Sequence, residues 1–164
     1  MAAVVSSNQQ FERHINTNNA QWDYVTMRIA GQLFGIPVLQ VQDVLGAQRI
    51  TRIPLAPPEV AGSLNLRGRI VTAIDVRSRL ELETRPQNLK EMSIVVEHSG
   101  ELYSLIVDEV GEVLNLEEAS YEQNPATMDR RWHEVSGGIH RLDDELLVIL
   151  DIGRLLSFAD LDAN

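Results

Sequence analysis

Short runs of alternating apolar and polar residues follow one another along most of the chain. Val25, Met27 and Ile29 alternate with Thr26 and Arg28, which is the period of a half-buried strand. Further runs of strand length lie at 33–38, 64–66, 70–74, 93–97, 102–107 and 146–150, with turn-forming or charged residues between them. We therefore predict an all-β fold of many short strands, in the barrel or sandwich class.

A few stretches depart from the strand pattern. We expect a helical turn near 128–132 and a short closing helix at 154–161. Residues 6–21 are rich in Asn, Gln, Ser and Thr, a composition that buries too little apolar surface to offset the entropy of ordering. We predict a disordered N-terminal tail over 1–21 and a folded domain over 22–161.

The apolar pattern of the first half recurs in the second half. In a first alignment, which places Gly31 on Gly100, Leu33 meets Leu102 and Val41 meets Val110. In a second alignment, which places Gly62 on Gly138, Ile74 meets Leu150 and Asp75 meets Asp151. The second alignment has a larger offset than the first. The extra residues fall in the loops between the matched segments, where insertions are tolerated. We predict a duplicated β-unit that forms two small barrels packed together, at roughly 24–85 and 90–158, with strand exchange between them as a possibility.

Composition and charge narrow the classes of function. The chain contains no cysteine, which excludes a disulfide framework, a thiolate metal site and a cysteine nucleophile and fits a reducing cytoplasm. A formal net charge of −10 disfavours nucleic acid and anionic membranes as partners. The apolar run at 2–5 is too short for a signal peptide, and no stretch reaches the ~20 apolar residues of a membrane helix. We expect a cytoplasmic protein that does not insert into membranes.

The paired Asp75 and Asp151 allow two interpretations. Each ends an apolar strand, one in each repeat, and a pseudo-twofold pair of aspartates is the arrangement of an aspartic hydrolase. Neither is followed by the Thr or Ser of that chemistry, and a β-branched apolar residue comes next in both. The second interpretation, which we favour, is that each aspartate caps a short helix that follows it.

No other group of residues predicts catalysis or a metal. The histidines His14, His98, His133 and His140 lack ligand spacing, so we expect surface histidines and no metal site. No glycine-rich phosphate loop precedes a helix, and no serine has a plausible His and Asp arrangement. We predict a chain without enzymatic activity and without a cofactor.

The segment Asn65-Leu66-Arg67-Gly68 is a candidate binding element. Alternation turns Leu66 inward and Arg67 outward, while Gly68 can adopt the positive φ of a tight turn and Asn65 can bond the nearby backbone. The guanidinium either docks a partner or bonds carbonyls of its own protein. Val38 and Val41, spaced for a bulged strand or a helical turn, are either core residues or part of an exposed interaction patch.

These residues also carry a family resemblance. Residues 62–68 (Gly-Ser-Leu-Asn-Leu-Arg-Gly), followed by 74–77 (Ile-Asp-Val-Arg), resemble the signature of the CheW family of chemotaxis coupling proteins. The resemblance extends over about 24–158. The family often has Pro where Thr72 stands and Gly where Ser104 stands, so we expect local backbone changes there without a change of role.

The resemblance implies two SH3-like, five-stranded β-barrel subdomains around a shared core, with short helices including a C-terminal one. It implies a non-catalytic adaptor, monomeric when isolated, that is recruited to membrane-associated receptor arrays. There it couples the cytoplasmic tip of a chemoreceptor to the regulatory domain of the CheA histidine kinase. The alternative is an adaptor of the same fold in an array that does not control motility. The partner-binding positions implied by the family are Val38, Val41, Asp43, Gly62, Asn65, Arg67 and Gly68.

Overall fold

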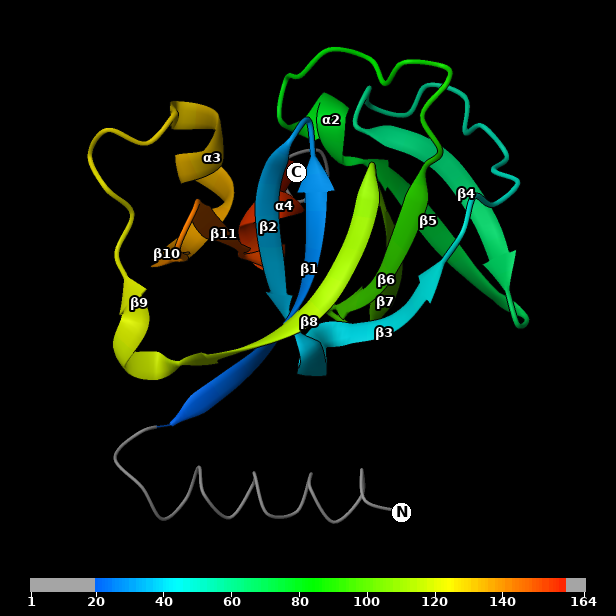
Figure 1. Ribbon diagram of the computed structural model, residues 1–164. Coiled ribbons are helices and arrows are strands. Elements are labelled where there is room, and N and C mark those ends of the chain that lie inside the picture. The colour runs from blue at the N-terminus through cyan, green and yellow to red at the C-terminus, as the bar shows by residue number, and fades with distance from the viewer. Residues whose placement is uncertain (1–19, 159–164) are drawn as a thin grey trace, which may run out of the picture.

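The computed structural model describes residues 20–158 (Figure 1). Most of the tail predicted at 1–21 therefore lies outside the described residues, as do residues 159–164. Gln21 is described and pairs with Glu117 in a sheet, so the prediction of disorder is wrong for this residue. A backbone hydrogen bond from Glu118 to the carbonyl of Ala20 extends the ordered chain one residue further.

Strands dominate the described chain, which confirms the all-β prediction. The strands are β1 (Gln21–Ile29), β2 (Gln32–Pro37), β3 (Val41–Leu45), β4 (Val60–Leu66), β5 (Arg69–Asp75), β6 (Met92–His98), β7 (Glu101–Val107), β8 (Glu109–Glu117), β9 (Tyr121–Glu122), β10 (Ser136–Arg141) and β11 (Leu146–Leu150). The helices are α2 (Val76–Arg79), α3 (Arg130–Val135) and α4 (Ile152–Leu155), with 3-10 turns η1 (Val38–Gln40) and η2 (Glu118–Ser120). None of these described helices is long and apolar enough to cross a bilayer.

The strands form two sheets. Sheet A has six strands in the order β8-β1-β2-β11-β10-β9, and sheet B has five in the order β3-β6-β7-β5-β4. The sixth strand of sheet A is the two-residue β9. Its counterpart in the first repeat is an isolated bridge between Thr51 and Ser63, so that this segment is not counted as a strand in sheet B.

Each sheet takes strands from both halves of the chain. Sheet A combines β1 and β2 with β8 to β11, and sheet B combines β6 and β7 with β3 to β5. The exchange is made through four pairings: β1 with β8 and β3 with β6 are antiparallel, and β2 with β11 and β5 with β7 are parallel. The ranges 24–85 and 90–158 thus mark two repeats in the sequence, whereas neither range alone makes up a sheet.

The two repeats have matching elements. In the second alignment, β4, β5 and α2 coincide with β10, β11 and α4. The helices start where an aspartate accepts a backbone hydrogen bond, so α3 begins after Asp129 and α4 after Asp151. This capping places α3 slightly later than the turn predicted at 128–132, and α4 earlier than the helix predicted at 154–161.

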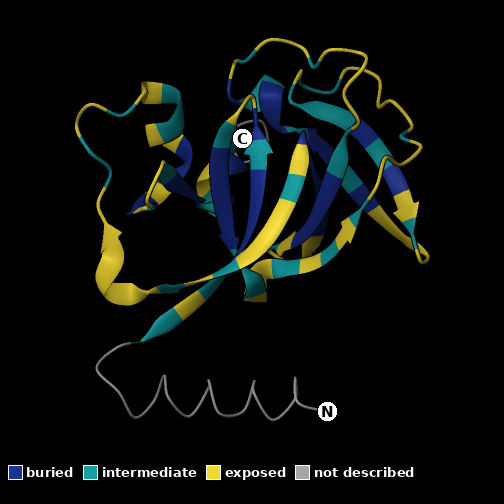
Figure 2. Ribbon diagram, in the orientation of Figure 1, coloured by how far each residue is buried: buried dark blue, intermediate teal, exposed yellow. Residues whose placement is uncertain are grey.

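The core lies between the sheets. Its largest cluster joins Met27 and Phe34 of sheet A to Ile94 and Leu105 of sheet B, all fully buried. Two smaller clusters lie within sheet B, around Leu64, Val71 and Leu102, and within sheet A, around Tyr24, Leu33 and Leu147. The shared core holds both repeats as one unit, and buried residues occur in strands of both sheets (Figure 2).

Candidate functional site

The β4–β5 hairpin displays its turn residues at one end of sheet B. Arg67 and Gly68 form the turn with φ angles of +53° and +86°, the conformation of a two-residue hairpin loop in which both central residues have positive φ. The side-chain oxygen of Asn65 accepts a hydrogen bond from the amide of Gly68 at 3.0 Å. The turn is therefore held by its own side chain, which fixes the direction of Arg67.

Arg67 forms an ion pair across the two edges of sheet B. Its Nη2 lies 3.0 Å from Oδ2 of Asp43 on β3, and the two side chains are 79% and 25% exposed. Within the described chain, the guanidinium hydrogen-bonds this carboxylate and not a backbone carbonyl. Most of its donors face outward and remain free for a partner.

Val38, Val41 and Gly62 lie deeper than the ion pair. Val38 is in η1 and Val41 begins β3, and both are half-buried against the shared core. Gly62, on β4, faces the backbone of Thr51 so closely that a Cβ would lie 2.3 Å from its carbonyl oxygen. Gly62 thus positions the loop beside the hairpin, and the valines are in large part core residues.

Two exposed apolar side chains neighbour these residues, one across the hairpin from Asn65 and one next to Asp43 on β3, and the sequence analysis did not single them out. Ile70 is 76% exposed and pairs with Asn65 on the hairpin, and Val44 is 39% exposed beside Asp43. We call Asp43, Val44, Asn65, Arg67 and Ile70 the hairpin surface. Apolar side chains around a charged group are a common composition of protein interfaces. The sequence placed Ile70 in an apolar strand but could not show that this end of the strand is exposed to solvent.

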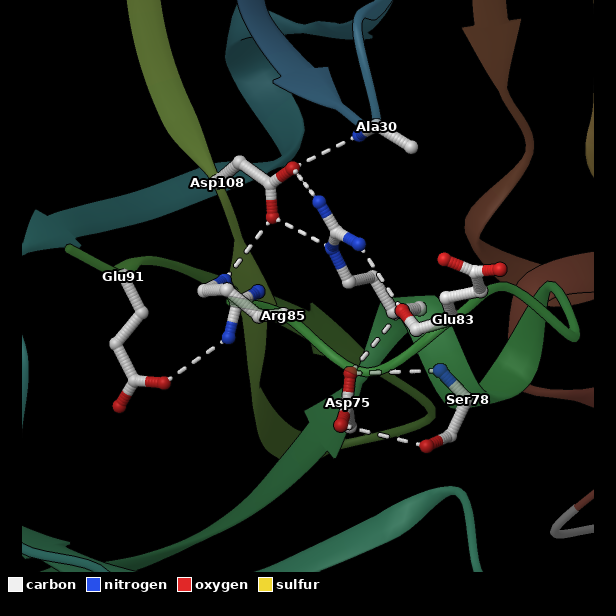
Figure 3. Close-up of polar contacts among 8 residues, drawn as sticks. Ala30, Asp75, Ser78, Glu83, Arg85, Glu91 and Asp108 are labelled. Carbon is white, nitrogen blue, oxygen red and sulfur yellow. Dashed lines mark hydrogen bonds and ion pairs between the residues drawn. The ribbon is translucent and has the colours of Figure 1, made fainter. Parts of the chain in front are cut away.

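Asp75 and Asp151 act as helix caps in the structure. Oδ1 of Asp75 accepts hydrogen bonds from the amides of Arg77 and Ser78 at the start of α2 (Figure 3). Oδ1 of Asp151 accepts one from the amide of Arg154 in α4. Each carboxylate thus serves the helix that follows it, which is a structural role.

A buried ion cluster, which the sequence analysis did not identify, lies near Asp75. The carboxylate of Asp108 accepts hydrogen bonds from Nε and Nη2 of Arg77, at 2.9 and 2.6 Å. It also accepts one from Nε of Arg85 at 3.0 Å and one from the amide of Ala30 at 2.8 Å (Figure 3). Burial raises the pKa of Asp108, but the hydrogen bonds from Arg77, Ala30 and Arg85 outweigh it, so that the pKa lies below its ordinary value. The cluster ties the β1–β2 turn and α2 to the connector after α2.

The ion cluster belongs to one repeat only. In the first alignment the counterpart of Asp108 is Leu39, which is 88% exposed, and in the second alignment the counterpart of Arg77 is Gly153. A charged residue directly after the buried strand β7 was a signal in the sequence. Its partners could not be found there, because they lie on other elements.

His140 is fully buried, so the prediction of a surface histidine is wrong for this residue. Its Nδ1 lies 2.8 Å from Oγ of Ser120 and its Nε2 lies 3.3 Å from the hydroxyl of Tyr24. The rings of Tyr24 and Tyr121 pack edge to face against it. In the second alignment, His140 takes the place of the core residue Leu64.

The buried imidazole predicts a stability that depends on pH. Burial lowers the pKa of His140, so the unfolded chain takes up this proton more readily, and stability should fall as the pH drops below about 6.5. His140→Gln should flatten this fall between about pH 7 and pH 5, as measured by thermal melts. Melts of the exposed His133→Gln variant show how far the loss of any one histidine changes the slope. An equal slope in wild type and His140→Gln would remove His140 as its source.

Comparisons with known proteins agree on one family. The family model described as CheW-like domain matches residues 23–160. The chain is 28% identical over 135 residues to chemotaxis protein CheW of Klebsiella aerogenes, covering 82% of this chain and 81% of that protein. It is 35% identical over 89 residues to protein PilI of Pseudomonas aeruginosa, covering 54% of this chain and 50% of that protein. The crystal structure of the scaffolding protein TtCheW from Thermoanaerobacter tengcongensis superposes with a TM-score of 0.74 at 32% identity, covering 82% of this chain and 92% of that one.

Proposed function

The chain belongs to the CheW-like domain family of non-catalytic chemotaxis scaffolds, and from this we propose that it couples the cytoplasmic tips of chemoreceptors to the regulatory domain of the CheA kinase. The observation that carries the proposal is the hairpin surface. It presents a directed, largely exposed arginine among exposed apolar side chains. Family membership also removes the aspartic hydrolase as an alternative, because the chain is a scaffold and not an enzyme.

The partners would contact the chain on and beside the hairpin surface. Arg67, held by Asp43 and aimed by the Asn65–Gly68 turn, offers free donors to a carboxylate or to carbonyl groups. Val41 lies on β3, the edge strand that also carries Asp43, and Val38 lies in η1, the turn before that strand. In this proposal the protein works in the cytoplasm, is recruited to membrane-associated receptor arrays by its partners, and is a monomer when isolated.

Replacing Arg67 with glutamate should weaken partner binding without unfolding the protein. The side chain is 79% exposed, so its loss costs little stability, whereas losing an interfacial arginine costs about 2 kcal/mol, or roughly thirtyfold in affinity. Co-sedimentation with receptor-tip helices and with the kinase regulatory domain, separately and together, measures the loss. A thermal melt checks the fold.

The matched control for this experiment is Arg141→Glu. Arg141 is also an exposed arginine on a hairpin strand, and it pairs with Glu122 in the other repeat at 2.9 Å. This variant should bind both partners as the wild type does. If folded Arg67→Glu also binds both partners like the wild type, Arg67 is not part of the interface, and Val38, Val41 and Asp43 become the next positions to test.

A second candidate is an adaptor of the same fold in a chemosensory array that does not control motility. It is supported by the match to protein PilI, a relative whose name is not that of a chemotaxis protein, over about half of each chain. The two candidate functions are distinguished by deleting the gene. The deletion strain is then scored for directed swimming in soft agar and for its behaviour on surfaces. A loss of directed swimming supports the chemotaxis adaptor, and a loss confined to surface behaviour supports the second candidate.

A further inference from the structure

An aromatic groove lies on sheet A, away from the hairpin surface of sheet B. It has a volume of about 260 Å³, and the residues that line it are Trp22, Tyr24, Pro37, Glu118 and Tyr121. Trp22 and Tyr121 are 46% and 42% exposed, whereas Tyr24 is almost fully buried and forms the base. The adjoining η2–β9 segment is open to solvent (Figure 2). Exposed aromatic side chains that share one groove are typical of binding surfaces.

The two tyrosine rings of the groove are held by contacts inside the protein. The hydroxyl of Tyr24 contacts Nε2 of the buried His140, and the hydroxyl of Tyr121 donates to the carbonyl of Gly137. The ring of Tyr121 also packs against His140. A groove of this volume is below the about 300–1,000 Å³ of pockets that enclose small molecules. Rigid, shallow and aromatic, it suits a peptide more than a small ligand.

The charge of the groove selects a basic occupant. Glu118 lines it, and Glu117 precedes it on the exposed end of β8. Neither carboxylate forms an ion pair within residues 20–158, whereas Glu122 nearby is neutralised by Arg141. A bound segment with an arginine or a lysine would find these free carboxylates at the rim.

The other repeat shows what occupies the corresponding place. In the first alignment, the counterpart of Trp22 is Glu91. Glu91 pairs with Arg85 at 3.1 Å, and Arg85, Pro86 and Glu91 line one cavity together. The residue before a proline is restricted to extended conformations. In sheet B the chain's own Arg-Pro segment thus lies beside the counterpart of Trp22, whereas the residues within 20–158 that line the groove of sheet A include no such segment.

We infer that the aromatic groove binds a proline-rich segment of a partner protein, with an arginine or lysine beside the prolines. Proline rings in the polyproline II conformation pack on aromatic side chains, and their preformed backbone lowers the entropy cost of binding. Trp22 and Tyr121 would hold the prolines, and Glu118 would pair with the cation. This surface is separate from the one in the proposed function, so a partner could occupy it while the hairpin surface is engaged.

The test uses the full chain, labelled with ¹⁵N, and a peptide of repeated Pro-Pro-Arg of about twelve residues, which is four turns of polyproline II. The peptide should shift the indole N–H signal of Trp22 and the amide signals of η2 and β9. A Gly-Ser-Arg peptide of equal charge and a Pro-Pro-Glu peptide should each bind at least roughly tenfold more weakly. The indole of Trp132, which packs on Phe34, serves as the internal reference.

Variants locate the binding. Trp22→Ala and Glu118→Arg should each lower the affinity for the Pro-Pro-Arg peptide by roughly tenfold or more, and Leu55→Ala, at a fully exposed apolar residue elsewhere, should not change it. Equal binding of the Gly-Ser-Arg peptide, unchanged binding by Trp22→Ala, or no shift with any peptide would overturn the inference. So would groove signals that shift on dilution alone, because a second copy of the chain would then be the occupant.

Discussion

Asp108→Asn should lower the free energy of unfolding by about 3–5 kcal/mol, because it leaves the buried Arg77 without its counter-charge and removes one of the two carboxylates that pair with Arg85. Arg77 is 8% exposed and Asp108 is 9% exposed, so little water can replace the lost carboxylate. Nη2 of Arg85 already has no hydrogen-bond partner in the described chain. Denaturant unfolding of wild type and variant measures the difference.

The control for Asp108→Asn is Glu145→Gln. Glu145 also accepts two hydrogen bonds from one arginine, Arg28, at 3.0 and 2.7 Å, but this pair lies at the surface. Its loss should cost at most about 1 kcal/mol. If the two variants lose equal stability, burial does not govern the strength of the cluster around Asp108.

Acid should weaken the wild type through the same carboxylate. The pKa of Asp108 in the folded protein is below its ordinary value, so the stability that it contributes is present above about pH 4 and is lost as the pH falls through the lower, folded-state pKa. Asp108→Asn lacks this contribution at every pH. The stability difference between wild type and variant should therefore shrink below about pH 4.

Gly62→Ala should lower the free energy of unfolding by roughly 3 kcal/mol, near the upper end for single substitutions. A Cβ at this position would lie 2.3 Å from the carbonyl oxygen of Thr51 and 2.6 Å from a side-chain carbon of Ile50, at a φ of +151°. The same Thr51 carbonyl accepts a hydrogen bond from Ser63 at 2.8 Å. The methyl group would thus break the bridge that holds the loop before β4.

Gly68→Ala separates the steric effect from the conformational one. Gly68 has a φ of +86°, and nothing lies within 4 Å of an added Cβ. The Gly68→Ala variant should lose only about 1 kcal/mol of its free energy of unfolding, which is the cost of a left-handed conformation for alanine. Chemical denaturation of both variants compares them. Equal losses would show that the close approach at Gly62 has no energetic consequence.

The sequence predicted the strands and the repeat because both depend on local pattern. The alternation around Val25 and Met27 is typical of a strand, although the polar Thr26 between them is buried as well. The order of strands in each sheet could not be predicted, because the parallel pairing of β2 with β11 joins segments near opposite ends of the chain. Alternation fixes which face of a strand is buried but does not specify its neighbour.

The candidate site was predictable in part. Arg67 and Asn65 were placed in a turn from the glycine that follows them, and the structure has that turn. The pairing of Arg67 with Asp43 depends on how the edges of sheet B approach each other, which local pattern does not encode. For the same reason the burial of His140, which occupies a leucine position of the repeat, could not be seen in its spacing from other histidines.

The most direct test of the central claim is kinase activity under receptor control. In vesicles that carry a chemoreceptor together with the kinase, autophosphorylation of the kinase should respond to the receptor's ligand only when this protein is added. Arg67→Glu should lose most of this response, and Arg141→Glu should retain it. A ligand response of equal size with and without the folded wild-type protein would contradict the account.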